Sequence, residues 1–193
     1  MPKFYIGPPQ RYQSSIDEEW KSLTTLDESQ LILSTFIGIG SAACLALIWK
    51  IIFDESLPFG SPTWNEIIIS SLILIFGHEV VHLLGFPNCG LNSKTIIGIW
   101  LQAGSPYVQY TSPMSRNRFL VMLILPVLIL SILPFFFAYN QAGFINQLSW
   151  ISVLNCIGAG SDLLIFSRII SIVPPKSRVI ESEKSLLWKQ NIV

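Results

Sequence analysis

Charged residues are scarce in this 193-residue chain, which has 12 Lys or Arg, 12 Asp or Glu and only 2 His. Their 12% share is about half of what a soluble domain usually carries. The three cysteines, Cys44, Cys89 and Cys156, are too few and too scattered for a disulfide framework. The net charge is zero and no basic stretch is interleaved with aromatic residues, so we expect no nucleic-acid partner. The first thirty residues lack the apolar core of a signal peptide, so the first apolar run should be retained.

The chain is instead rich in long apolar runs. Hydrophobic residues make up 51% of the chain, and its mean hydropathy is +0.55. Crossing about 30 Å of hydrocarbon takes about 20 helical residues. Four runs are long enough, namely residues 31–53, 66–86, 119–139 and 148–173. We therefore predict an all-α integral membrane protein with about four transmembrane helices, embedded in the lipid bilayer as a single domain over residues 1–193.

The basic residues predict the orientation of this bundle. Lysine and arginine gather in residues 1–30, in the loop between the second and third runs, and in residues 174–193. The other two connections, residues 54–65 and 140–147, contain none. By the positive-inside rule, the N-terminal segment, the middle loop and the tail are predicted to be cytoplasmic. Lys50, near the outer end of the first run, is the exception and can snorkel to the interface.

Both histidines lie in one apolar stretch, LIFGHEVVHLLGFP. Burying an unpaired imidazole or carboxylate costs several kcal/mol, so a partner or a metal must compensate these groups. His78 and His82, four residues apart, share one helix face and can converge on one ion, while Glu79 can reach a water that the ion activates. Zinc accepts neutral imidazole nitrogen and needs a third protein ligand. On a soluble helix HExxH can be a solvated face, but a bilayer span offers none, which favours a metal site.

The third ligand should come from another span at the same depth. At 1.5 Å per residue, His78 lies about 18 Å, His82 about 24 Å and Asp162 about 21 Å along their runs. Asp162, in NCIGAGSDLLIF, is therefore the predicted third ligand, and its alternative is a pairing with Arg168 or a lumenal water. Asn155 lies two turns earlier on roughly the same face. It either donates to a substrate carbonyl, as part of an oxyanion site, or holds an interhelical contact.

The loop between the second and third runs is not a simple linker. Its segments TIIGIWLQ and PYVQYT are rich in β-branched and aromatic residues and are separated by AGS. This pattern predicts a short cytoplasmic β-hairpin-like loop beside the mouth of the site. The loop either holds an extended substrate by strand addition or only caps the bundle.

Four segments, HEVVHLLGFP, SPMSRNRF, FLVMLILPVLI and NCIGAGSD, together resemble the zincin peptidases, a bacterial integral-membrane family whose active-site plan is similar to that of site-2 proteases. The resemblance covers roughly residues 66–173. It implies Zn2+ as cofactor, His78, His82 and Asp162 as its ligands, Glu79 as catalytic acid/base, and a multi-pass protein of a bacterial plasma membrane. The aspartate departs from the site-2 pattern, because it lies in GSDLL and not in an LDG-type motif.

The predicted function is that of an intramembrane zinc metallopeptidase. It would hydrolyse peptide bonds of a membrane protein or membrane-associated peptide through a zinc-activated water, with a glutamate as acid/base. Two other classes stay open. One is a non-catalytic membrane interaction or regulatory protein with a structural zinc, and the other is a metal-dependent hydrolase of a lipid or a small amide.

Overall fold

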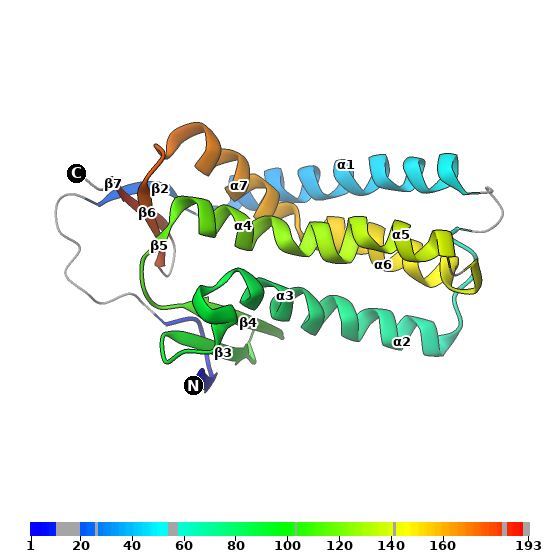
Figure 1. Cartoon of the computed structure of the whole chain (residues 1–193), viewed down its shortest axis with the longest axis horizontal. Coiled ribbons are helices and arrows are strands. Elements are labelled where there is room, and N and C mark those ends of the chain that lie inside the picture. The colour runs from blue at the N-terminus through cyan, green and yellow to red at the C-terminus, as the bar shows by residue number, and fades with distance from the viewer. Residues whose placement is uncertain are drawn as a thin grey trace.

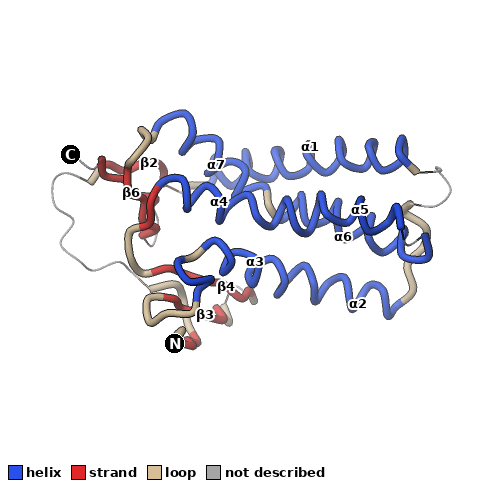
Figure 2. The backbone as a smooth tube through the Cα atoms, viewed as in Figure 1, coloured by secondary structure: helices blue, strands red, loops and turns tan. Residues whose placement is uncertain are grey.

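Apolar helices form a bundle, and two small β-sheets lie at one of its ends (Figures 1 and 2). The computed structural model describes residues 1–10, 20–25, 27–53, 58–102, 104–140, 142–182 and 185–190. The distribution of basic residues predicted that the two tails and the middle loop lie on the same side of the membrane. Their described strands do share one end of the bundle (Figure 1).

The first two apolar runs form helices with clear starting signals. α1 (Glu28–Ile52) begins after Asp27, whose side chain accepts a hydrogen bond from the N–H of Gln30. α2 (Trp64–Leu72) begins with a capping box between Thr63 and Glu66. A π-helical turn, Ile73–Gly77, then leads without a break into α3 (His78–Gly85), and a 3-10 turn, Pro87–Gly90, follows.

The third run is one long helical segment with a wide turn at its centre. It consists of α4 (Arg116–Pro126), a π-helical turn over Val127–Ile132, and α5 (Leu133–Asn140). Pro126 and Pro134 lie beside the two ends of this turn, and a proline cannot donate the helical hydrogen bond at its position. The wide turn therefore occurs where the helix lacks regular donors.

The fourth run is bent and does not form a straight span. After a 3-10 turn at Ala142–Phe144, α6 (Ile145–Gly158) and α7 (Gly160–Ile172) meet at an angle of 54°. Three helical segments in the described residues, Glu28–Ile52, Trp64–Gly85 and Arg116–Asn140, are each long and apolar enough to cross a membrane, and the bent pair makes a fourth only if it counts as one span. Apolar side chains such as Phe36, Trp64 and Phe136 project outward from these helices, as expected for a lipid-facing surface.

The all-α prediction is wrong, because the described part of the chain contains seven strands in two sheets. In the first sheet, β1 (Lys3–Ile6) pairs in parallel with β3 (Thr95–Trp100), which forms an antiparallel hairpin with β4 (Ser105–Tyr110). The second sheet has the order β2-β7-β6-β5, with β2 (Lys21–Thr25), β7 (Ser185–Gln190), β6 (Ser177–Ser182) and β5 (Met114–Ser115). The expected hairpin is thus one part of a larger β region.

The strands of the N-terminal tail are not evident from the sequence because their partners lie far away along the chain, whereas β6 and β7 of the C-terminal tail pair with each other. β1 pairs with the middle loop, and β2 pairs with β7 near the other end of the chain. Such pairings leave no local turn signal between the partners. The apolar side chains of β6 and β7 instead complete a core cluster between the second sheet and the helices, which contains Phe86, Met114, Phe119, Met122, Ile169, Val179, Leu186 and Trp188.

A close crossing of α1 with the bent pair holds the break between α6 and α7 in place. A Cβ atom on Gly38 would collide with the carbonyl of Ile157, and one on Gly160 would collide with the carbonyl of Ser34. Only glycine therefore allows the two backbones to approach this closely. Because Asp162 lies in the first turn of α7, the crossing sets the position of its carboxylate.

Candidate metal centre

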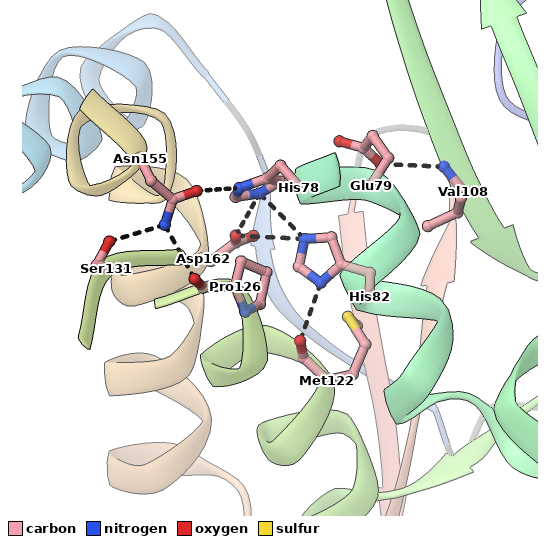
Figure 3. A network of polar contacts seen from close by, with 9 residues as sticks. All are labelled: His78, Glu79, His82, Val108, Met122, Pro126, Ser131, Asn155 and Asp162. Carbon is pink, nitrogen blue, oxygen red and sulfur yellow. Dashed lines mark hydrogen bonds and ion pairs between the residues drawn. The ribbon is translucent and has the colours of Figure 1, made fainter. Parts of the chain in front are cut away.

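Two imidazoles from α3 and a carboxylate from α7 converge (Figure 3). The Asp162 Oδ2 atom lies 3.1 Å from His78 Nε2 and 3.4 Å from His82 Nε2. The two Nε2 atoms are 3.2 Å apart. His78 and His82 come from α3 and Asp162 from α7, so the structure brings together the three predicted ligands. Within the described ranges, this is the group of His, Cys, Asp or Glu side chains that could hold an ion.

Hydrogen bonds fix the tautomer of both histidines. Asn155 Nδ2 donates to the carbonyl of Pro126 at 3.0 Å and to Ser131 Oγ at 2.9 Å, which leaves Asn155 Oδ1 as an acceptor. His78 Nδ1 lies 3.0 Å from that oxygen and must therefore carry the proton. His82 Nδ1 donates to the carbonyl of Met122 at 2.9 Å. The Nε2 atoms of both neutral rings are therefore left with lone pairs that point at Asp162.

This donor set fits zinc. Three atoms that each carry a lone pair would repel one another at these distances unless they shared a cation. Zinc bonds of about 2.0–2.1 Å at tetrahedral angles would place neighbouring ligand atoms about 3.3 Å apart. The observed separations of 3.1, 3.2 and 3.4 Å agree with that spacing. Two imidazoles and one carboxylate form a three-ligand set typical of catalytic zinc, with one position left for water.

The close approach of α3 to α4 allows His82 to contact the main-chain carbonyl of Met122. A Cβ atom on Gly85 would meet the backbone of Met122, so the two helices touch where one of them has no side chain. His82, one turn before Gly85, can then reach a main-chain carbonyl of α4. Arg118 Nε donates to the carbonyl of Gly85 at 3.0 Å and holds the end of α3 on the same helix.

The Glu79 carboxylate points to the side of the three-ligand group, toward β4 (Figure 3). Its Oε2 atom accepts a hydrogen bond of 3.1 Å from the N–H of Val108. β4 is an edge strand of the first sheet, so this N–H is one of those that the sheet itself does not use. Glu79 thus lies between the possible metal ligands and the edge of a strand.

Two cavities meet at this group. A cavity of about 230 Å³ between the two sheets, lined on one side by β4 and on the other by β6, reaches Glu79, His82 and Asp162. A second cavity of about 330 Å³ reaches the same three residues from the side of the π-helical turn before α3 and the break between α6 and α7. β4 borders both, since Pro106 lines the second cavity and Tyr110 the first. Strand β4 therefore passes the site from one cavity to the other.

The contacts of Asn155 bear on the two roles left open for it. Its side chain is only 2% exposed, and its amide nitrogen already donates to two acceptors between α6 and the third helical segment. This arrangement favours the interhelical role over donation to a substrate carbonyl. Cys89 lies exposed in the turn after α3 and is not part of the metal-binding group. Sequence reasoning missed the main-chain groups of Met122 and Val108, which leave no side-chain signal.

The apolar helices and the ligand group define a zincin-like protein suited to a membrane. The sequence model of a family described as "Putative zincin peptidase" matches residues 71–177, which is more than half of the chain and includes the HExxH segment and Asp162. The chain belongs to this family. Membership implies zinc as the metal and, in general, a zinc metallopeptidase. Neither a curated protein nor a solved structure matches the chain.

Proposed function

We propose that this protein is an intramembrane zinc metallopeptidase with a site-2-protease-like plan, which cleaves membrane proteins or membrane-associated peptides. The observation that carries the proposal is the place of Glu79, between a three-ligand group and the edge of a strand. A peptide that pairs with that edge would have its backbone beside both the acid/base and the metal. A structural zinc site has no need of such an arrangement.

In this proposal His78, His82 and Asp162 hold the metal, and Glu79 moves the proton. Zinc bound there would supply Lewis acidity to a water molecule and to the substrate carbonyl. Glu79 takes a proton from the attacking water as its oxygen forms a bond to the carbonyl carbon. The same carboxyl group then gives the proton to the amide nitrogen as the C–N bond breaks. Val108 holds Glu79 by Oε2, which leaves Oε1 for the proton transfer.

The substrate would bind in an extended form along β4. A helical substrate hides its carbonyls in its own hydrogen bonds, so the segment to be cut must unwind before hydrolysis. Alternate residues of β4 direct their backbone groups away from β3. These residues are Pro106, Val108 and Tyr110. A strand added there would run from one cavity to the other past the ligand group. If the hairpin only caps the bundle, blocking the edge of β4 should leave peptide binding unchanged.

The surroundings of the second cavity support a membrane substrate. Leu74, Ile75 and Leu154, from the apolar helical segments, line it together with His78. A peptide entering from the hydrocarbon would meet this cavity first. By the positive-inside rule, the end of the bundle that carries the sheets would face the cytoplasm, with both termini on that side.

The test compares membrane peptides from cells that make the wild-type protein or Glu79→Gln. We expect new peptide ends, near the boundaries of membrane segments, only with the wild type, and equal zinc content in both proteins. Glu28→Gln, which changes an exposed residue in the first turn of α1, is the matched control and should behave as wild type. Identical peptides in all three samples would favour a structural zinc. A Glu79-dependent product found only in lipid extracts would favour a lipid or small-amide hydrolase.

A further inference from the structure

The cavity between the two sheets contains a carboxylate that the proposed chemistry does not use. Glu181 lies on β6 and lines this cavity of about 230 Å³, across from β4. The other lining residues are mostly apolar or aromatic, among them Phe86, Tyr110, Met114, Phe119, Val179 and Leu186. A carboxylate beside such a wall calls for an explanation, because apolar surroundings disfavour its charged form.

Glu181 faces the cavity because of its register on β6. Successive side chains of a strand point to opposite faces, so Glu181 shares the face of Val179, whose side chain is buried in the core cluster behind the cavity. Glu181 itself is exposed. The protein packed around its carboxylate nevertheless raises its pKa above the ordinary value, and the Glu79 carboxylate raises that pKa further.

No lysine or arginine is found among the described residues that line the cavity with this carboxylate. The other carboxylates among these residues, Glu79 and Asp162, are also acidic. With a zinc ion on Asp162, Glu79 and Glu181 would still face one space. This space attracts a cation and repels an anion.

We infer that this cavity is a substrate subsite for a lysine or arginine side chain, with Glu181 as the residue that selects it. The inference rests on the proposed peptidase function. The long apolar stem of a basic side chain suits the aromatic and aliphatic walls, while its charged end can reach Glu181. Because the cavity also borders Glu79, His82 and β4, the residue seated there lies close to the bond that is cut.

The charge pattern of membrane proteins fits this subsite. Lysine and arginine are concentrated where a membrane segment meets the cytoplasm. If the sheets face the cytoplasm, a segment drawn out along β4 would place its boundary residues between β4 and β6. The subsite would then select the basic end of a membrane segment, and acidic residues at that position would be rejected.

Binding of extended fluorescent peptides tests the subsite without any need for cleavage. The peptides differ at one position, which carries lysine, norleucine or glutamate. The zinc-loaded full chain with Glu79→Gln, in lipid nanodiscs, is the parent protein. We expect it to bind the lysine peptide about tenfold more tightly than the glutamate peptide, a usual size for one close charge pair. Adding Glu181→Gln should reduce this difference to about threefold or less, and adding Glu181→Lys should reverse it.

Two further variants control for folding and for charge outside the cavity. Glu181→Asp keeps the charge and should keep most of the preference, and Glu28→Gln should leave it unchanged. Equal affinity of the parent for the lysine and glutamate peptides would overturn the subsite, as would a lysine preference that survives Glu181→Gln in a variant with full zinc content. Cleavage by the wild type without charge preference would keep the peptidase function and overturn the subsite. A Glu181-dependent preference without any cleavage would support the subsite and count against the peptidase.

Discussion

The main-chain carbonyl of Met122 accepts a hydrogen bond of 2.9 Å from His82 Nδ1. Residue 126, four positions further along α4, is proline and has no N–H to donate to that carbonyl. The proline therefore leaves free an acceptor that the helix would otherwise use, and His82 takes it. Pro126 also supplies its own carbonyl to Asn155, which orients His78. A single proline thus contributes to the orientation of both histidines.

Replacing this proline should weaken zinc binding. In Pro126→Ala the new N–H competes for the carbonyl of Met122, so His82 loses its fixed tautomer and ring position. Loss of such a supporting hydrogen bond typically lowers metal affinity by about 10- to 100-fold. Competition with a chelator measures the affinity. Pro134→Ala, in the same helical segment but outside the ligand network, is the control and should keep wild-type affinity. Equal affinities of both variants and the wild type would show that Pro126 only shapes the helix.

Asn155→Ala distinguishes the two roles left open by the sequence. If Asn155 orients His78, its removal should lower zinc affinity by about 10- to 100-fold, and excess zinc should restore much of the activity. Donation to a substrate carbonyl predicts the reverse pattern, with normal zinc affinity and a lower kcat that zinc does not restore. Zinc titration with parallel measurement of kcat and KM therefore decides between the roles. Ser131→Ala, which removes only one acceptor of the Asn155 amide, should have a smaller effect in the same direction.

The sequence predicted which three side chains come together at the site because their signal is local and chemical. Two histidines at helical spacing in an apolar run, and one aspartate at matching depth, do not depend on knowing the rest of the fold. The groups that orient these side chains could not be predicted, because the carbonyls of Met122 and Pro126 are main-chain groups that every residue has. The strands of the N-terminal tail were missed for a different reason. β1 and β2 have partners far along the chain, and pairing over such distances depends on the finished fold.

Asp162→Ala and Glu79→Gln should separate metal binding from catalysis. Asp162 supplies one of three ligand atoms and a negative charge beside two neutral rings, so its loss should lower zinc affinity more than about a hundredfold and stop hydrolysis. Glu79→Gln keeps all three ligands and should keep about one zinc per chain, while the amide can no longer accept the proton of the water. Metal analysis of the purified variants makes the comparison. Full zinc occupancy in Asp162→Ala would rule out Asp162 as a ligand.

The edge of β4 can be blocked at the residue that contacts Glu79. The N–H of Val108 points away from β3, so Val108→Pro removes no hydrogen bond of the sheet but puts a proline ring at the outer edge, where an added strand would have to lie. If the substrate adds to this edge, an extended peptide should bind about tenfold more weakly to Val108→Pro. The comparison is made in the zinc-loaded Glu79→Gln protein, so that loss of the Glu79 contact cannot act through proton transfer. Val108→Ala keeps the N–H and should bind as the parent does. Unchanged peptide affinity in a Val108→Pro protein with full zinc content would mean that the hairpin only caps the bundle.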